Sequence, residues 1–192
     1  MKVSLHILIC SFFIFIWAGC SPKTTNNVSE KQESSAVNSK KIWKDTDPTF
    51  TNRECPGKIF PTSYRMLDVD TAMMRHLLII QGNKPGEIST DTILIDIPLP
   101  DESWEEFRIT QVQVMAPELA AKYPYIKTYS GYAKLYPADQ IRLEVSPEGI
   151  RAMILSSRGT VLIDPFCKED KLHMISFFKK NLPEGAKQDF EK

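Results

Sequence analysis

The sequence predicts an α+β domain, an antiparallel strand meander with one longer and one shorter helix. Three observations point to this fold class. Apolar and polar residues alternate in several short runs of the second half of the chain, and turns of roughly two to five residues separate the runs. One earlier segment has apolar residues at helical spacing. The composition, with 42% hydrophobic and 25% charged residues, is that of an ordinary globular protein.

The first expected element of the domain is the longer helix. Asp68 or Asp70 is its expected N-cap, Ile80 its last residue, and Gly82 the residue that closes it. Its apolar face is expected to comprise Leu67, Met74, Leu77, Leu78 and Ile80.

Two strands and the short helix are expected next. Ile93, Ile95, Ile97 and Leu99 occupy every second position of residues 93–99, which end in a Pro-Leu-Pro turn, and this predicts a strand. Residues 104–115 form a second strand, in which the apolar phase changes between Ile109 and Val112 and suggests a bulge. A proline suits the first position of a short helix at 117–122.

The rest of the domain is expected to be strand. The domain itself is expected to span 65–182, and residues 183–192 are polar and expected to fray. The remaining strands are expected at 126–135, 141–145, 150–156, 161–164 and 172–178.

The N-terminus carries the most specific signal. Lys2 precedes an apolar stretch at residues 5–17, and two small residues stand directly before Cys20. The stretch is too short to span a bilayer and is typical of a signal peptide. Its end resembles the lipobox of bacterial lipoproteins, although Trp17 stands where leucine is usual. We expect removal of residues 1–19 and acylation of the Cys20 thiol, which anchors the chain in a membrane; the alternative is a plain secretory signal cleaved elsewhere.

Two segments are expected to link the anchor to the domain. Residues 20–41 are dominated by Ser, Thr, Asn, Lys, Glu and Gln, so they cannot bury enough surface to offset their ordering entropy. They are expected to form a flexible tether with a reach of about 25 Å. Residues 42–64 are punctuated by prolines and are expected to be extended and turn-rich. The expected location is the outer membrane, facing the periplasm.

Composition and motifs exclude several functions. Loss of Lys2 with the signal changes 24 basic and 24 acidic residues to 23 and 24, so nucleic acid is not an expected partner. His6 lies in the signal, and His76 and His173 lack the spacing of a zinc helix. Neither a Gly-x-Ser-x-Gly motif nor a phosphate-binding loop is present. We therefore expect no enzyme activity, no cofactor and no metal.

Two polar or aromatic groups remain as weaker candidates. The acidic turn at residues 101–106 is expected to be a solvated hairpin end rather than a cation site. A set of expected surface tyrosines forms either a partner-binding face or ordinary cross-strand packing. These are Tyr123, Tyr125, Tyr129, Tyr132 and Tyr136.

The cysteines predict one disulfide. Cys10 is lost with the signal and Cys20 is acylated, which leaves Cys55 and Cys167. Two thiols in an oxidising compartment are expected to pair, with free thiols as the alternative. The bridge would contribute about 4–5 kcal/mol in the chain-entropy model.

Several segments between residues 65 and 182 carry a family resemblance. The strongest is MAPELAAKYP at 115–124, which continues into IKTYSG at 126–131. Further matches are RMLD at 65–68, IPLPD at 97–101, Phe107-Arg108, IRL at 141–143, GIRAMIL at 149–155 and IDPF at 163–166. In this order they resemble the N-terminal pro-domain of secreted bacterial reprolysin-like zinc metalloproteases.

The resemblance implies a function without catalysis. A pro-domain assists the folding of its protease and occludes the cleft, but the zinc helix of the family is not present in this sequence. An unpaired Cys55, or less readily Cys167, would be the candidate thiolate ligand to the protease zinc. The expected function is therefore binding of a zinc metalloprotease in trans. The alternatives are a structural or ligand-binding envelope lipoprotein without a protease link and the remnant of a truncated protease gene.

Overall fold

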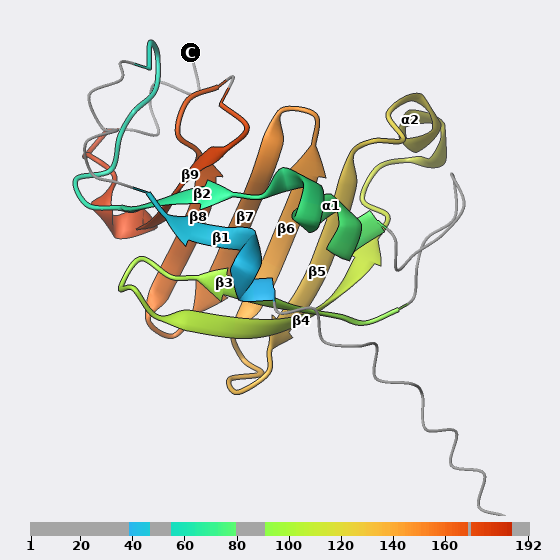
Figure 1. Cartoon of the computed structure of the whole chain (residues 1–192), viewed down its shortest axis with the longest axis horizontal. Helices are drawn as coiled ribbons and strands as arrows, with labels where there is room; N and C mark the ends of the chain where they lie inside the picture. Colours follow the sequence, from blue (N-terminus) through green and yellow to red (C-terminus); the bar gives the residue numbers. More distant parts are fainter. Residues whose placement is uncertain (1–38, 47–54, 80–90, 169, 186–192) are drawn as a thin grey trace, which may run out of the picture. The chain divides into compact units, whose positions relative to one another are not determined.

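One antiparallel sheet dominates the fold (Figure 1). The computed structural model describes residues 39–46, 55–79, 91–168 and 170–185. Their nine strands lie in the order β1-β2-β9-β8-β7-β6-β5-β4-β3, so the sheet is a meander from β3 to β9, extended by β2 and β1. The strands are β1 Trp43–Asp45, β2 Arg65–Val69, β3 Ile93–Pro98, β4 Trp104–Val112, β5 Lys127–Ala133, β6 Gln140–Ser146, β7 Gly149–Ser156, β8 Gly159–Pro165 and β9 His173–Phe178. The expected antiparallel meander is confirmed.

The helices of the described residues are few and short. They are η1 Ser39–Ile42, α1 Thr71–Ile79, α2 Pro117–Lys122 and η3 Lys179–Asn181. Helix α2 lies where the sequence predicts it. Because η1 begins at Ser39, a 3% exposed residue, the last three residues of the expected tether are folded.

Helix α1 begins later than one of the two predicted caps. The Asp70 carboxylate accepts a hydrogen bond from the Met73 N–H (2.8 Å), which satisfies a free donor of the first turn. The Asp68 alternative is wrong, since Leu67 and Asp68 belong to β2. Leu67 packs in the main core and Met66 in a second cluster on the other face, so successive residues point to opposite faces, as in a strand. The predicted helix end at residues 80–82 lies outside the described residues.

Two other expectations differ from the structure. Strand β4 ends at Val112, and its register with β5 runs without an inserted residue from Phe107 to Val112. The phase change at Val112 is therefore the end of the strand rather than a bulge. Gly131 of β5 allows the close approach of β4, because a Cβ there would lie 1.9 Å from the Arg108 carbonyl oxygen.

The main core lies inside the curl of the sheet. Alternate residues of each strand point inward, as in Ile93, Ile95 and Ile97 of β3, which are at most 2% exposed. Helix α1 contributes Met74 and Leu77 to the same cluster. Removal of this apolar surface from water is the main stabilising term.

A second cluster covers the outer face of β2 and β9. It consists of Met66, Phe166, Cys167, Ile175 and Phe177, packed under side chains that include Phe60 and Tyr64. Cys55 and Cys167 form a disulfide, which fastens the segment 55–64 to the loop before β9. Both faces of β9 are therefore buried, from Met174 to Phe177.

The sheet curls so that β3, at one edge, lies against residues of η1, β1 and β9 near the other edge. The Ser39 hydroxyl bonds with the backbone N–H of Asp96 (2.8 Å), and the Trp43 indole donates to the Asp96 carbonyl (3.1 Å). The Ser176 hydroxyl of β9 donates to the carbonyl of Pro98 (3.0 Å), a residue without an N–H. Side chains thus satisfy the outward backbone groups of β3 at Asp96 and Pro98, which prevents pairing with another chain there.

We expect Ser176→Ala to lower the free energy of unfolding by about 1–3 kcal/mol, because the Pro98 carbonyl loses its buried donor. Urea denaturation measures this loss. The exposed Ser157→Ala is the control and should change it by less than about 0.5 kcal/mol. Equal effects of the two variants would contradict a stabilising role of the closure.

Replacement of both Cys55 and Cys167 by Ser should lower the free energy of unfolding by up to about 4–5 kcal/mol, since the bridge spans 112 residues. The wild-type chain in reductant should unfold at the denaturant concentration of the double variant. A loss below about 1 kcal/mol would mean that packing of the segment 55–64 alone keeps it in place.

Candidate functional site

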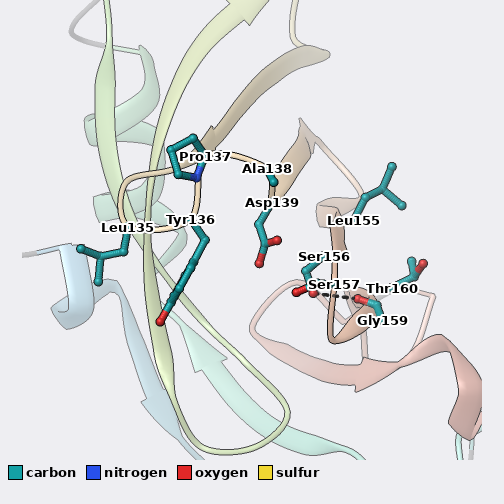
Figure 2. A pocket seen from close by; sticks show the side chains of 10 residues that line it. All are labelled: Leu135, Tyr136, Pro137, Ala138, Asp139, Leu155, Ser156, Ser157, Gly159 and Thr160. Carbon is teal, nitrogen blue, oxygen red and sulfur yellow. Dashed lines mark hydrogen bonds between the residues drawn. The ribbon is translucent and has the colours of Figure 1, made fainter.

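An open groove lies at one end of the sheet, between two hairpins (Figure 2). The β5–β6 connection supplies one wall and the β7–β8 turn the other. Its volume is about 600 Å³, within the range of ligand sites. The lining residues are Leu135, Tyr136, Pro137, Ala138, Asp139, Leu155, Ser156, Ser157, Gly159 and Thr160.

The walls of the groove carry large exposed apolar side chains. Leu135 is 79% exposed, Tyr136 60% and Leu155 48%. The first two belong to the β5–β6 connection, and Leu155 lies on the outward face of β7, opposite Gln140. None of the three packs into the core, so their apolar surface is available to another molecule.

A charged cluster lies beside the groove. Arg158, in the β7–β8 turn, donates to Oε2 of Glu105 (2.7 Å) and lies 3.6 Å from Oδ2 of Asp139. Burial raises the pKa of Glu105, against the opposing effect of Arg158, and the charges of Asp139 and Asp101 raise it further. One guanidinium therefore serves three neighbouring carboxylates.

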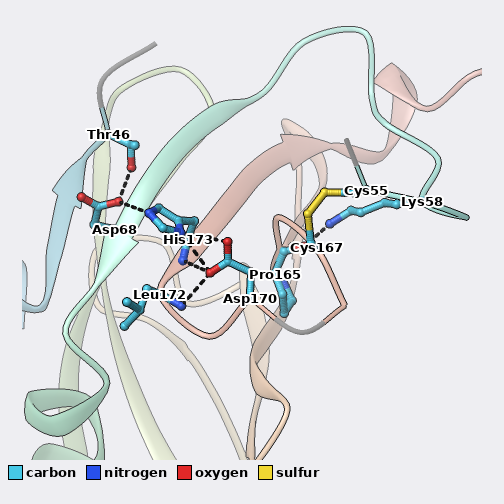
Figure 3. Close-up of polar contacts among 9 residues, drawn as sticks. All are labelled: Thr46, Cys55, Lys58, Asp68, Pro165, Cys167, Asp170, Leu172 and His173. Atoms are coloured by element: carbon cyan, nitrogen blue, oxygen red, sulfur yellow. Dashed lines mark hydrogen bonds and ion pairs between the residues drawn. A yellow bond between two sulfur atoms is a disulfide. The ribbon is translucent and has the colours of Figure 1, made fainter. Parts of the chain in front are cut away.

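A histidine bridges two acidic residues on the other side of the domain (Figure 3). Nδ1 of His173 lies 2.8 Å from Oδ2 of Asp170, and Nε2 lies 3.6 Å from Oδ1 of Asp68. The hydroxyl of Thr46 donates to Asp68 (2.6 Å) rather than to the ring. Because both ring nitrogens face carboxylates, this arrangement fixes β2 and the loop before β9 and does not resemble a nucleophile with its base.

The Asp170 carboxylate is held in its charged form. Burial alone would raise its pKa, but hydrogen bonds from the backbone N–H groups of His173 (3.0 Å) and Leu172 (3.1 Å), together with the His173 ring, outweigh burial and lower it. The Asp170 side chain thus stabilises the loop before β9 through hydrogen bonds to the backbone of that loop and of the first residue of β9.

A half-buried lysine lies beside the disulfide (Figure 3). Lys58 Nζ donates to the carbonyl of Pro165, and its charge lies 5.6 Å from the Phe60 ring centre. Burial lowers the pKa of Lys58 to about 8, although Asp164 opposes this shift. These contacts hold the segment 55–64 on the outer cluster, in addition to the disulfide.

The β4–β5 connection, residues 113–126, forms an exposed excursion that contains α2 (Figure 1). None of its residues is buried, and among its apolar side chains Val114 is 60% exposed, Leu119 46% and Tyr125 54%. Its order comes from local contacts, including the N–H of Tyr123 on the Leu119 carbonyl (3.0 Å). It is therefore an apolar surface that packing within the domain does not require.

The candidate site residues predicted from the sequence lie in different parts of the structure. Cys55 and Cys167 pair as expected, so neither thiol is available as a zinc ligand. Cys20 lies outside the described residues. In the acidic turn, Glu105 points inward to Arg158 instead of being solvated, and Glu106 pairs with Lys134 (2.6 Å).

One tyrosine expectation is wrong, and one histidine has a role that the sequence does not predict. Tyr129 is not a surface residue: it is 1% exposed, and its hydroxyl donates to the Leu78 carbonyl (2.9 Å). The sequence does not predict the bridging role of His173, because Asp68 lies 105 positions away and no spacing links the two. His76 is exposed in the last turn of α1.

Comparison of the chain with protein-family models, with curated proteins and with solved structures finds no match. In the part of the chain that the structure describes, no group of three or more His, Cys, Asp or Glu side chains is placed to hold a metal ion. No helix of those residues has the length and apolarity needed to cross a membrane. The function of the chain is therefore inferred from its surfaces and its sequence features.

We expect Asp170→Asn to lower the free energy of unfolding above about pH 4, and to lower it less at pH values below that. The folded-state pKa of Asp170 is lowered, so the stability it contributes is present above its unfolded value of about 3.9 and is lost as the pH falls through the folded value. Urea denaturation at several pH values from 2 to 7 measures the difference between variant and wild type. Glu148→Gln, in an exposed turn, is the control, and a difference that stays constant with pH would refute this assignment.

Proposed function

We propose that the chain is a non-catalytic lipoprotein of the bacterial envelope whose domain binds a zinc metalloprotease, as an inhibitor or a folding assistant. Cys20 anchors it in the outer membrane, and the domain faces the periplasm. It acts by binding rather than by catalysis, since the sequence contains no Gly-x-Ser-x-Gly motif, zinc helix or phosphate-binding loop.

The observation that carries the proposal is the excursion of residues 113–126. It presents Val114, Leu119 and Tyr125 to solvent on a segment that local hydrogen bonds already order. An ordered apolar surface loses little entropy on binding, which favours contact with a partner. Helix α2 contributes no buried residue, so its apolar side chains serve no packing purpose inside the domain.

The resemblance supports the choice of partner. Its strongest segment, residues 115–124, is nearly the whole excursion. A pro-domain contacts its protease through surface residues rather than through core residues. A short helix with adjacent tyrosines suits the edge of a protease cleft, because aromatic side chains are favoured in protein interfaces.

The disulfide supports the proposed periplasmic location. A bridge between Cys55 and Cys167 persists in an oxidising environment such as the periplasm and is rare in the cytosol. It agrees with export directed by residues 1–19, which lie outside the described part of the chain.

The test is inhibition or protection of a reprolysin-like zinc metalloprotease from the same cell by the purified chain. Leu119→Ser should weaken the effect about tenfold or more, because burial of one leucine contributes about 1.5–3 kcal/mol. Leu172→Ser is the matched control: Leu172 is similarly exposed, at 54%, but lies before β9, and its loss should have no effect. Steady-state protease kinetics and refolding yields give the readout. No complex and no change in either quantity would reject the proposal.

A further inference from the structure

The groove at the β5–β6 end offers a second surface, which is independent of the excursion. The two surfaces lie at opposite ends of β5, because residues 113–126 precede Lys127 and the groove hairpin follows Ala133. Both walls of the groove carry apolar side chains, Leu135 and Tyr136 on the β5–β6 connection and Leu155 on β7 (Figure 2).

The apolar surface continues beyond the groove on the outer face of the sheet. Tyr132 of β5, 49% exposed, pairs with Gln140 of β6, which pairs with Leu155 of β7. Met153, 38% exposed, lies two residues before Leu155 on the same face. The same face carries exposed Arg108 opposite Tyr132 and exposed Arg142 opposite Met153, so the apolar strip is short and lies close to the groove.

Around Arg158, beside the groove, negatively charged side chains outnumber positively charged ones. Asp139 lines the groove and is 4% exposed, while Glu105 is 6% exposed and Asp101 lies within electrostatic range of both Glu105 and Arg158. Three carboxylates thus face one guanidinium. The neighbouring Glu106 does not change this balance, since it pairs with Lys134.

One oxygen of this cluster lacks a partner. Within the described residues, Oε1 of Glu105 is buried and has no hydrogen-bond donor, although Oε2 binds Arg158. A buried acceptor without a donor costs about 1–3 kcal/mol, more if it is charged. Asp101 of the same cluster is exposed, so a second cation from outside can approach the carboxylates there.

We propose that this groove binds a basic polypeptide segment of another protein, in which Lys or Arg alternates with apolar residues. The apolar residues pack on Leu135 and Leu155, and the cation is attracted to the carboxylates beside Asp139. A volume of about 600 Å³ holds a few side chains of such a segment.

The charge distinguishes this occupant from two others. In a symmetric dimer through this face, each acidic cluster would meet its own copy, and like charges repel. Anionic lipid headgroups would be repelled for the same reason. A basic polypeptide is the occupant that complements both the apolar walls and the excess negative charge.

The test uses fluorescence polarisation with the full chain in detergent and a labelled peptide, Leu-Arg-Leu-Lys-Leu. We expect saturable binding with a Kd below about 0.1 mM, weakened by salt, and no saturable binding of Leu-Glu-Leu-Glu-Leu. Leu135→Ser and Leu155→Ser should each raise Kd about tenfold, and Asp101→Asn a few-fold. These sites are exposed, so circular dichroism should show a folded chain for each variant.

Three control variants distinguish the groove from the rest of the protein surface. Leu172→Ser, Glu148→Gln and Leu119→Ser should leave peptide affinity unchanged, and the last also separates the groove from the protease-binding excursion. Equal binding of the acidic peptide, or no loss in Leu135→Ser and Leu155→Ser, would overturn the proposal. It would also be overturned if light scattering showed a doubled mass that Leu135→Ser abolishes, because a second copy would then occupy the groove.

Discussion

The fold depends on the closure of the sheet around β3. An edge strand normally presents free N–H and C=O groups. In β3 the backbone groups of Asp96 and Pro98 instead form hydrogen bonds with side chains of η1, β1 and β9. Arg65 of β2 adds hydrogen bonds to the carbonyls of Leu99 (3.2 Å) and Ser103 (3.3 Å), just beyond the strand. The same contacts keep the inner side chains away from water, so hydrogen bonding and apolar burial stabilise one arrangement.

The two ends of the curled sheet are filled by different chemistry. Helix α1 contributes apolar side chains, with Tyr129 bonded to the Leu78 carbonyl. The other end contains Glu105, Arg158 and Asp139. Glu105 and Asp139 are buried while Arg158 is 41% exposed, and the desolvation of the two carboxylates offsets much of their attraction to Arg158. Stability alone therefore does not explain the charged cluster, which agrees with the binding role proposed for the groove beside it.

Both proposed binding surfaces lie on connections at the ends of strands, not on the core. The excursion contains no buried residue, and the groove residues Leu135 and Tyr136 belong to a connection. A rigid sheet positions them, while the disulfide and Lys58 fix the outer cover at a distance from both. Substitutions in either surface can therefore alter binding without unfolding the domain.

Local pattern in the sequence determined the strand β3, the helix α2 and the meander from β3 to β9, because side-chain period and turn residues act over a few positions. It also identified the two cysteines that pair, because the expected loss of Cys10 and acylation of Cys20 leave only these two. Only the tertiary structure decided the place of β2 beside β9 and the meeting of Glu105 with Arg158, 53 positions apart. Those contacts follow from the curl and register of the sheet, which no local period encodes.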